Sequence, residues 1–209
     1  MKFWSDSFSD GTRLREEYAF IKPHPTAQAE LAKNRNPHFA WGELPEGTKS
    51  LVIIMHDIDA PTSKDFVNKR DKMVPYDYPR QEFYHWAVVD LDPKVFVQPA
   101  EFSKEVTIKG KPGPAGVRNT RHALNDFTDW YKGNATMEGQ YFGYDGPAPP
   151  WNDEKLHNYI FTLYALREKR CPIEGTFTAK DLLNALSGGV VLEKAQLRCT
   201  FAILPKARA

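Results

Sequence analysis

Histidine and carboxylate side chains gather at the ends of strand-like segments. Asp57 and Asp59 come at the end of an apolar run, and His85 opens the next apolar segment. His157 and Tyr159 begin a third segment and would share one face of an extended chain. Carboxylates and imidazoles brought together can transfer protons, ligate a metal ion or bind a small charged ligand. The alternative is that each of these side chains is an ordinary surface or core group whose hydrogen bonds are made within the protein or with water.

Four segments predict the strands that must position these residues. Residues 50–57 include a short apolar run typical of a buried strand, and residues 84–91 are rich in β-branched and aromatic side chains. Residues 157–166 and 195–203 alternate in the way half-buried strands do. If antiparallel neighbours pair in one sheet, the acids leave one strand where the histidines enter the next. The sequence therefore predicts a polar pocket made of strand ends.

Helical signals are few. Thr178 can cap a helix over residues 179–187, which Gly188–Gly189 would end. Residues 27–35 predict a second helix. With 16 prolines and 13 glycines, this pattern predicts a mainly β fold, a β-sandwich with a few short peripheral helices. The length of 209 residues suits a single domain over 1–209.

Two long stretches predict irregular structure. Residues 62–82 mix charges, aromatics and prolines between two strands, and residues 109–150 contain closely spaced glycine and proline. Loops of this length usually form the walls or lids of sites, or are disordered. The many aromatic side chains around 127–151 favour packed walls over disorder.

Composition excludes several classes of function. Lys plus Arg is 28 and Asp plus Glu is 27, and neither half of the chain is strongly basic, so we do not expect bulk nucleic-acid binding. Cys171 and Cys199 match no zinc or disulfide pattern. The longest purely apolar run, 51–55, is far too short to span a membrane, and the N-terminus has no apolar core of a signal peptide. We therefore expect a cytoplasmic protein with no membrane span.

Five motifs in order resemble the phosphatidylethanolamine-binding protein family. They are Asn-Pro-His-Phe-Ala-Trp at 36–41, Asp-Ile-Asp-Ala-Pro at 57–61, His85 with the apolar residues after it, Gly-Pro-Ala-Pro-Pro at 146–150, and the strand that starts at His157. Asn-Asp-Phe at 125–127 matches as well. The chain is most similar to the bacterial and archaeal branch, often called Raf kinase inhibitor-like proteins, from about residue 5 to 204.

The resemblance implies a β-sandwich flanked by short helices, with a small pocket for anions such as phosphate or the head group of phosphatidylethanolamine. It implies no cofactor, no metal and no catalytic residue. Carried over residue by residue, the implied ligand-binding residues are Asp57, Asp59, Ala60, Pro61, Phe83, His85, Gly146, Pro150, His157 and Tyr159.

Such a set suits a head-group receptor. The histidines can donate to phosphate oxygens, and the Tyr159 hydroxyl and the Gly146 backbone N–H add neutral donors. Free carboxylates at Asp57 and Asp59 would repel phosphate. They fit if they fix the imidazole tautomers, raise the histidine pKa values, or accept from a ligand ammonium group.

The chain departs from the family pattern at several positions. Ile58 replaces a usual proline, and Asn158 replaces a usual arginine and should face away from the pocket. Asp145 adds an acid that we expect at the pocket mouth. The insertion at about 62–82 is longer than in typical bacterial members, and we expect a rim, a partial lid or a dimer contact there.

The predicted function is that of a non-enzymatic binding protein for a small phosphorylated or anionic ligand. The resemblance also implies a kinase or protease as a possible protein partner, and a possible homodimer, but fold and pocket do not dictate partners. A whole phospholipid seated at a membrane surface fits less well, because the pocket suits only the head group. The alternative is a metal-assisted hydrolase that uses the Asp/His cluster, although no H-E-x-x-H or G-x-S-x-G motif is present.

Overall fold

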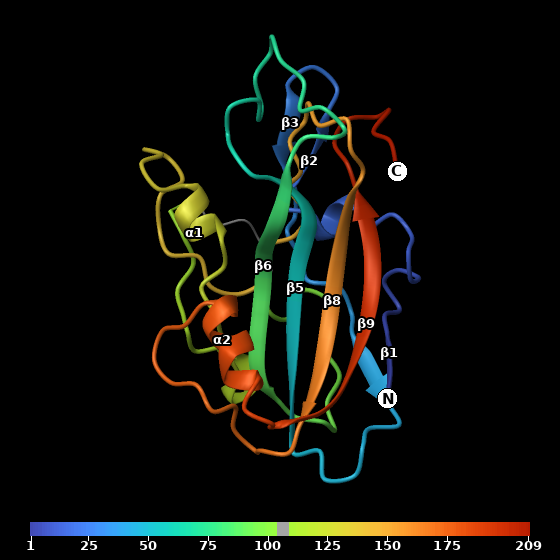
Figure 1. Cartoon of the computed structure of the whole chain (residues 1–209), viewed down its shortest axis with the longest axis vertical. Helices are drawn as coiled ribbons and strands as arrows, with labels where there is room; N and C mark the ends of the chain where they lie inside the picture. Colours follow the sequence, from blue (N-terminus) through green and yellow to red (C-terminus); the bar gives the residue numbers. More distant parts are fainter. Residues whose placement is uncertain (104–108) are drawn as a thin grey trace.

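A five-stranded antiparallel sheet forms the centre of the molecule (Figure 1). The structure is a computed structural model that describes residues 1–103 and 109–209. Strands β5, β6, β8 and β9 run side by side along most of its length. From one edge to the other, the strands are β7 (Arg121–His122), β6 (Arg80–Leu91), β5 (Ser50–Pro61), β8 (His157–Leu166) and β9 (Val191–Phe201).

Smaller elements surround this sheet. Two short antiparallel pairs join β1 (Lys2–Trp4) to β4 (Ala40–Gly42) and β2 (Ile21–His24) to β3 (Gln28–Leu31). The described α-helices are α1 (Phe127–Trp130) and α2 (Ala179–Leu186), and single 3-10 turns lie at Glu16–Tyr18 and Val117–Asn119. The predicted mainly β fold with short helices is confirmed.

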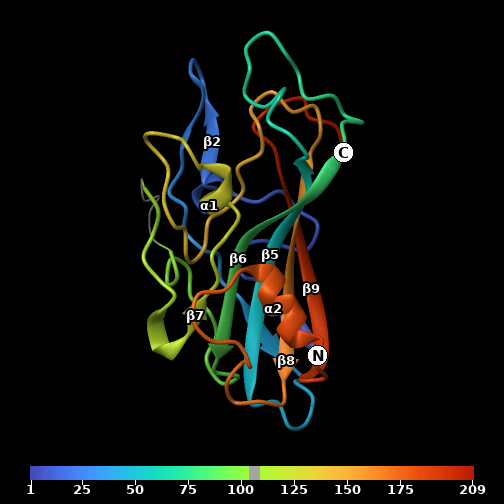
Figure 2. The same cartoon turned by 60° about the vertical axis from the view of Figure 1, so that its left-hand side comes forward.

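Strand β5 is buried on both faces, which explains its unbroken apolar run. Leu51, Ile53 and Met55 pack in one core cluster with residues of β6, β8 and β9, whereas Val52 and Ile54 pack in a second cluster on the other face. Helix α2 covers that second face, as Figure 2 shows. Core packing on both faces therefore fixes the first half of β5. The second half, which contains Asp57 and Asp59, can then carry polar side chains without disturbing this core.

Helix α2 begins as the sequence predicts. The Thr178 hydroxyl accepts from the Asp181 backbone N–H at 3.2 Å, and the Asp181 carboxylate accepts from the Thr178 backbone N–H at 2.9 Å. This reciprocal cap satisfies two of the N–H groups that a helix start leaves without partners. The helix ends at Leu186, one residue before the predicted end.

The predicted helix over residues 27–35 is wrong. Residues Gln28–Leu31 form β3, which pairs with Ile21–His24 in a hairpin, and Gln28 has a left-handed φ of 64° at the turn. Beyond the hairpin, the backbone N–H groups of Ala32 and Asn34 donate to the carbonyls of Phe20 and Ala19. Backbone pairing with a neighbouring segment has overridden local helix propensity.

Two strands are longer than the predicted ranges of 50–57 and 84–91. Strand β5 continues to Pro61 and β6 begins already at Arg80, because Ala60–Gln81 and Pro61–Arg80 still pair beyond the core. The register shifts between Asp57 and Ala60, which marks a β-bulge. The last strand is shifted toward the N-terminus and ends at Phe201.

Candidate functional site

A small cavity lies where β5 leaves the sheet and where β6 and β8 enter it. Its volume is about 100 Å³. Strand ends supply one wall, and the loop over residues 62–79, α1 and residues 148–150 supply the others. The lining residues are Ile21, Asp57, Ala60, Pro61, Val67, Asn68, Phe83, His85, Phe127, Trp130, Tyr131, Ala148, Pro149, Pro150 and His157.

Seven of the ten expected site residues line this cavity, and three do not. Antiparallel pairing brings the seven together, because Asp57 lies opposite both Phe83 on β6 and Tyr159 on β8. The seven are Asp57, Ala60, Pro61, Phe83, His85, Pro150 and His157. The other three, Asp59, Gly146 and Tyr159, are not among the lining residues.

A row of four alternating charges begins at the cavity wall with Asp57 and His157. His157 Nδ1 lies 2.7 Å from Asp57 Oδ2, and His157 Nε2 lies 3.1 Å from Asp153 Oδ2. Arg80 donates to both oxygens of Asp153, at 2.6 and 3.0 Å. The side chains of Asp57, His157 and Asp153 are at most 4% exposed. Buried charges of this kind persist only when each is paired, as each is here.

These neighbouring charges hold His157 in its charged form. Burial alone would lower the pKa of His157, but the charge of Asp57 and the hydrogen bonds with Asp153 and Asp57 outweigh it and raise that pKa to about 9. Burial would raise the pKa of Asp57, yet the charge and hydrogen bond of His157 lower it. Both ring nitrogens of His157 therefore donate to carboxylates. The expected donation from His157 to a ligand is not available in this arrangement.

Asp59 faces away from the cavity. Its Oδ2 accepts from the backbone and side-chain amides of Asn158, each at 2.9 Å, and Lys155 Nζ lies 3.3 Å from its Oδ1. Asp57 Oδ1 accepts from the Asp59 backbone N–H at 2.7 Å, which turns the chain at the bulge. Asn158 thus serves as a cross-strand partner of Asp59.

His85 is the histidine that opens into the cavity. Its Nδ1 lies 3.1 Å from the carbonyl oxygen of Asp145 and 3.0 Å from that of Gly146. No described residue pairs with Nε2, and the whole residue is only 2% exposed. Burial lowers the pKa of His85 to about 4, although the Asp57 charge and the two carbonyls oppose this effect. The ring is therefore neutral at pH 7.

Gly146 supports His85 and has no free donor for a ligand. Its backbone N–H donates to Asn34 Oδ1 at 2.8 Å, so the expected donor is already in use. A Cβ at this position would lie 1.9 Å from the Tyr18 carbonyl oxygen. Only glycine lets the chain pass Tyr18 so closely and still present its own carbonyl to His85.

Asp145 is buried rather than at the mouth, contrary to expectation. It is 0% exposed, and its carboxylate accepts from Lys111 and Asn34, each at 2.8 Å, and from Asn125 at 2.7 Å. These partners come from three distant loops. They fix the segment whose two carbonyls hold His85.

Tyr159 carries the one buried side-chain polar atom without a hydrogen-bond partner in the described parts of the chain, its hydroxyl oxygen. The ring lies 5.3 Å from the His85 ring, centre to centre. Burial and the nearby Asp57 charge raise the pKa of Tyr159 well above its ordinary value. The hydroxyl is therefore a protonated donor beside the cavity.

The loop over residues 62–79 forms part of the cavity wall. Asn152, which is fully buried, donates from Nδ2 to the carbonyls of Phe66, Lys69 and Lys72 at 2.8, 3.2 and 2.7 Å. Its Oδ1 accepts from the Asn68 backbone N–H at 2.9 Å. Four hydrogen bonds from one side chain thus hold Asn68 and its neighbour Val67 against the cavity.

Sequence reasoning missed several positions of the candidate site. Arg80 and Asp153 carry no periodic or motif signal, since they lie at the edges of irregular stretches. Ala148 and Pro149 could have been found, because they belong to the Gly-Pro-Ala-Pro-Pro motif. The aromatic residues around 127–131 were expected as packed walls, and Phe127, Trp130 and Tyr131 do line the cavity.

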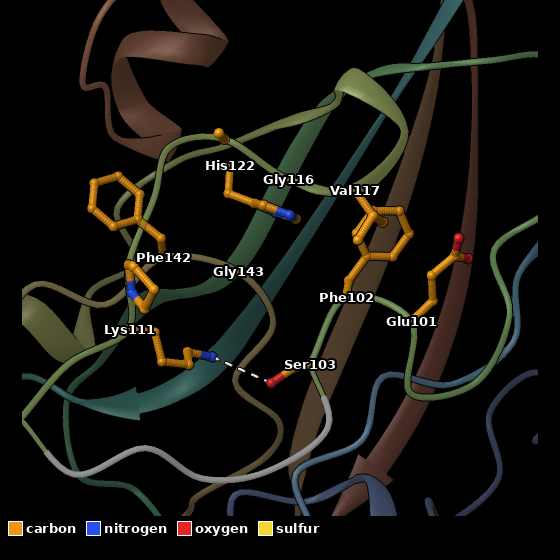
Figure 3. Close-up of a pocket in the computed structure, with 11 residues that line it drawn as sticks. Glu101, Phe102, Ser103, Lys111, Gly116, Val117, His122, Phe142 and Gly143 are labelled. Atoms are coloured by element: carbon orange, nitrogen blue, oxygen red, sulfur yellow. Dashed lines mark hydrogen bonds between the residues drawn. The ribbon is translucent and has the colours of Figure 1, made fainter.

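A second cavity is larger but contains none of the expected residues. Its volume is about 630 Å³, and Figure 3 shows Lys111, Ser103 and His122 at its wall. The Lys111 ammonium is already bound to Asp145, and His122 Nδ1 accepts from Trp86 Nε1 at 3.2 Å. Burial, with the charge of Lys111, lowers the pKa of His122 to about 3. The polar groups here pair with the protein itself, so we take the smaller cavity as the candidate site.

Two further features bear on function. Across residues 1–103 and 109–209, His, Cys, Asp and Glu side chains form no group of three or more that could hold a metal ion. Over the same residues, no helix is long and apolar enough to cross a membrane.

Comparison with known proteins identifies the family. Residues 4–202 match the family described as phosphatidylethanolamine-binding protein. The UPF0098 protein YbhB of Escherichia coli is 31% identical over 174 residues, which cover 83% of each chain.

Two crystal structures share the fold. A phosphatidylethanolamine-binding protein homolog from Chlamydia trachomatis superposes with a TM-score of 0.62 at 24% identity over 95% of each chain. E. coli YbcL, described as a new member of the mammalian PEBP family, superposes with a TM-score of 0.63 at 20% identity over 96% of this chain and 97% of YbcL. The chain belongs to the phosphatidylethanolamine-binding protein family, within its bacterial and archaeal UPF0098 branch.

Proposed function

We propose that this protein binds a small phosphate-bearing ligand, such as the phosphoethanolamine head group, in the cavity at the ends of β5, β6 and β8. The observation that carries the proposal is His85, which lines the cavity and whose Nε2 has no hydrogen-bond partner among the described residues. A ring nitrogen that makes no bond within the protein is available to a ligand. The name of the matching family supports the same ligand.

Cavity size favours a head group over a whole lipid. Sites for drug-sized ligands occupy about 300–1,000 Å³, whereas this cavity measures about 100 Å³. A phosphate group fits inside, and acyl chains would stay outside.

Polar groups around the cavity suit a zwitterion. The Asn68 side-chain oxygen accepts from the Trp151 backbone N–H at 3.0 Å, which leaves its NH₂ group for a ligand oxygen. Lys64 Nζ lies 4.5 Å from the centre of the Trp130 ring, so a positive charge stands close to the mouth. The aromatic faces of Phe83 and Phe127, whose centres are 5.0 Å apart, offer an apolar or cation–π surface to an ammonium group.

The metal-assisted hydrolase is less well supported. Such an enzyme needs histidine lone pairs directed at a metal ion, but both nitrogens of His157 face carboxylates. Regulation of a kinase or protease would be a separate function, and no contact among the described residues favours it. A non-enzymatic binding role therefore remains the proposal.

Calorimetric titration tests this function. We expect phosphoethanolamine and inorganic phosphate to bind the wild-type protein saturably and His85→Ala to lose that binding. His24→Ala, a change at the turn end of the β2–β3 hairpin and outside the set of lining residues, is the matched control and should bind as wild type does. Circular dichroism of His85→Ala checks that the fold persists. Equal binding by wild type and His85→Ala would refute the site, and no binding of either ligand to wild type would refute the function.

A further inference from the structure

We propose that Lys64, in the loop over residues 62–79, supplies the positive charge that this cavity needs to hold a phosphate. This inference rests on the proposed function, because it assigns a further binding residue to the same cavity. It follows from the charges of the cavity wall and from the contacts of the Lys64 ammonium group.

The cavity wall has no net charge of its own. The charged lining residues among those described are Asp57 and His157, whose side chains lie 2.7 Å apart and neutralise each other. His85 is neutral at pH 7, because burial lowers its pKa to about 4. A phosphate that enters the cavity leaves water, and an anion out of water is costly unless it meets a positive charge. This wall can therefore hold a phosphate tightly only with a cation from outside the lining.

Three cations on the segments around the cavity are already paired with carboxylates. Each would have to give up its partner before it could neutralise a ligand, which makes it a poor source of charge. The pairs, with their shortest N–O distances, are Arg80–Asp153 at 2.6 Å, Lys22–Glu30 at 2.9 Å and Lys155–Asp59 at 3.3 Å.

Lys64 differs from these cations because no carboxylate of residues 1–103 and 109–209 forms a salt bridge with it. Its Nζ donates to the backbone carbonyl of Trp130 and lies 4.5 Å from the centre of the Trp130 ring. A carbonyl oxygen and a ring face attract an ammonium group less strongly than a full negative charge does. The positive charge of Lys64 is thus available to a phosphate.

Lys64 lies at the edge of the cavity. Its own segment lines the cavity at Pro61, three residues before it, and at Val67, three residues after it. Trp130, which its ammonium group contacts, belongs to the wall that α1 supplies. Because a lysine side chain is long and flexible, the ammonium group can turn from Trp130 to a bound phosphate without a change in the backbone.

Lys72 in the same loop provides a matched comparison. Its Nζ also lies over an aromatic ring, 5.2 Å from the centre of Phe66. It too forms no salt bridge with an Asp or Glu in the described parts of the chain. Phe66 does not line the cavity, whereas Trp130 does. The two lysines therefore have the same charge and similar contacts, and they differ in their position relative to the cavity.

Calorimetry at pH 7 in a buffer free of phosphate tests the proposal. The probes are inorganic phosphate, phosphoethanolamine and its diester glycerophosphoethanolamine. We expect Lys64→Gln to bind each probe about tenfold more weakly than wild type, because a hydrogen bond between two charged groups is lost. Lys64→Arg keeps the charge and should recover most of the affinity. Lys72→Gln is the matched control and should bind as wild type does.

Ionic strength gives an independent readout. From about 50 to about 300 mM KCl, the affinity of wild type for phosphate should fall more steeply than that of Lys64→Gln, because salt screens one charge pair fewer in the variant. A packing role of Lys64 at Trp130 would not produce this difference in slope.

The outcomes separate this inference from the proposed function. Unchanged affinity of Lys64→Gln for all three probes would overturn the role of Lys64 and leave the proposed function standing. Equal losses in Lys64→Gln and Lys72→Gln would also overturn it, since the charge of the whole loop would then be responsible. Failure of every probe to bind wild type would overturn both.

Discussion

His157 Nδ1 lies 2.7 Å from Asp57 Oδ2, and this contact joins the start of β8 to the end of β5. Asp153 and Arg80 extend it into a chain of four alternating charges. The cation next to the cavity is therefore a structural one, neutralised on both sides. His85, which the same strands bring to the cavity without a side-chain partner, is left to meet a ligand.

Breaking the charge chain should destabilise the fold. Asp153→Asn removes the negative charge between Arg80 and His157, and loss of one partner of a buried ion pair costs about 3–5 kcal/mol. Urea unfolding followed by tryptophan fluorescence measures the change. Glu154→Gln alters a partly exposed carboxylate that pairs with Arg208, and we expect a loss below about 1 kcal/mol. Equal losses of unfolding free energy in the two variants would show that the buried charges stabilise the fold no more than an exposed ion pair does.

Stability should fall as pH rises through the pKa of folded His157. The raised pKa of about 9 compares with an ordinary value of 6.5, so the contribution is complete below pH 6.5 and lost by about pH 9. Across this window the folded protein binds one proton more than the unfolded chain, which gives a slope of about 1.4 kcal/mol per pH unit. The unfolding free energy of wild type minus that of His157→Gln isolates this effect. A difference that does not vary from pH 6.5 to 9 would contradict the assignment of charge.

The loop over residues 62–79 should open when Asn152 is replaced. Asn152→Ala removes four hydrogen bonds, each worth about 1 kcal/mol. We expect trypsin to cleave this loop, which contains several lysines and Arg70, at least about tenfold faster, and phosphoethanolamine to bind more weakly. Asn134→Ala, in an exposed turn, is the control. If neither the cleavage rate nor the affinity for phosphoethanolamine changes, Asn152 does not hold this loop in a conformation that the ligand needs.

The close approach of Gly146 to Tyr18 should tolerate no side chain. Gly146→Ala brings a Cβ against a backbone oxygen at 1.9 Å, so the chain around His85 must shift. We expect a loss of about 2–4 kcal/mol and weaker phosphoethanolamine binding. Gly188→Ala, whose nearest atom would be 3.5 Å away, should remain within about 1 kcal/mol of wild type. Full ligand affinity in folded Gly146→Ala would show that the two carbonyls need no exact placement.

The sheet and the cavity could be predicted from sequence because their signals are local. Residues 51–55 are apolar in succession since both faces of β5 are buried, and the strand predicted over 157–166 has the same bounds as β8. Antiparallel order then places Asp57, His85 and His157 at neighbouring strand ends. Motif order supplied the family, and the comparisons confirm it.

What the sequence did not reveal depends on partners that are distant in the chain. From its sequence neighbours, Asp145 was expected at the pocket mouth. In the structure Lys111, Asn34 and Asn125 surround it, and all three are distant in sequence. The role of His157 follows from Asp153, which lies in an irregular segment with no periodicity. The segment over residues 27–35 has good helix formers, but hairpin pairing with β2 decides its structure. The bulge in β5 likewise separates the side chains of Asp59 and Asp57, although residues two apart in a regular strand share one face.

Histidine NMR during a titration with phosphoethanolamine tests the central claim most directly. The ring Cε1–H signals of His85 and His122 report on the small and the large cavity in one experiment. We predict that the His85 signal shifts saturably and that the His122 signal stays in place, because the ligand binds at the ends of β5, β6 and β8. A shift of His122 with no change at His85 would contradict the account and assign the ligand to the larger cavity.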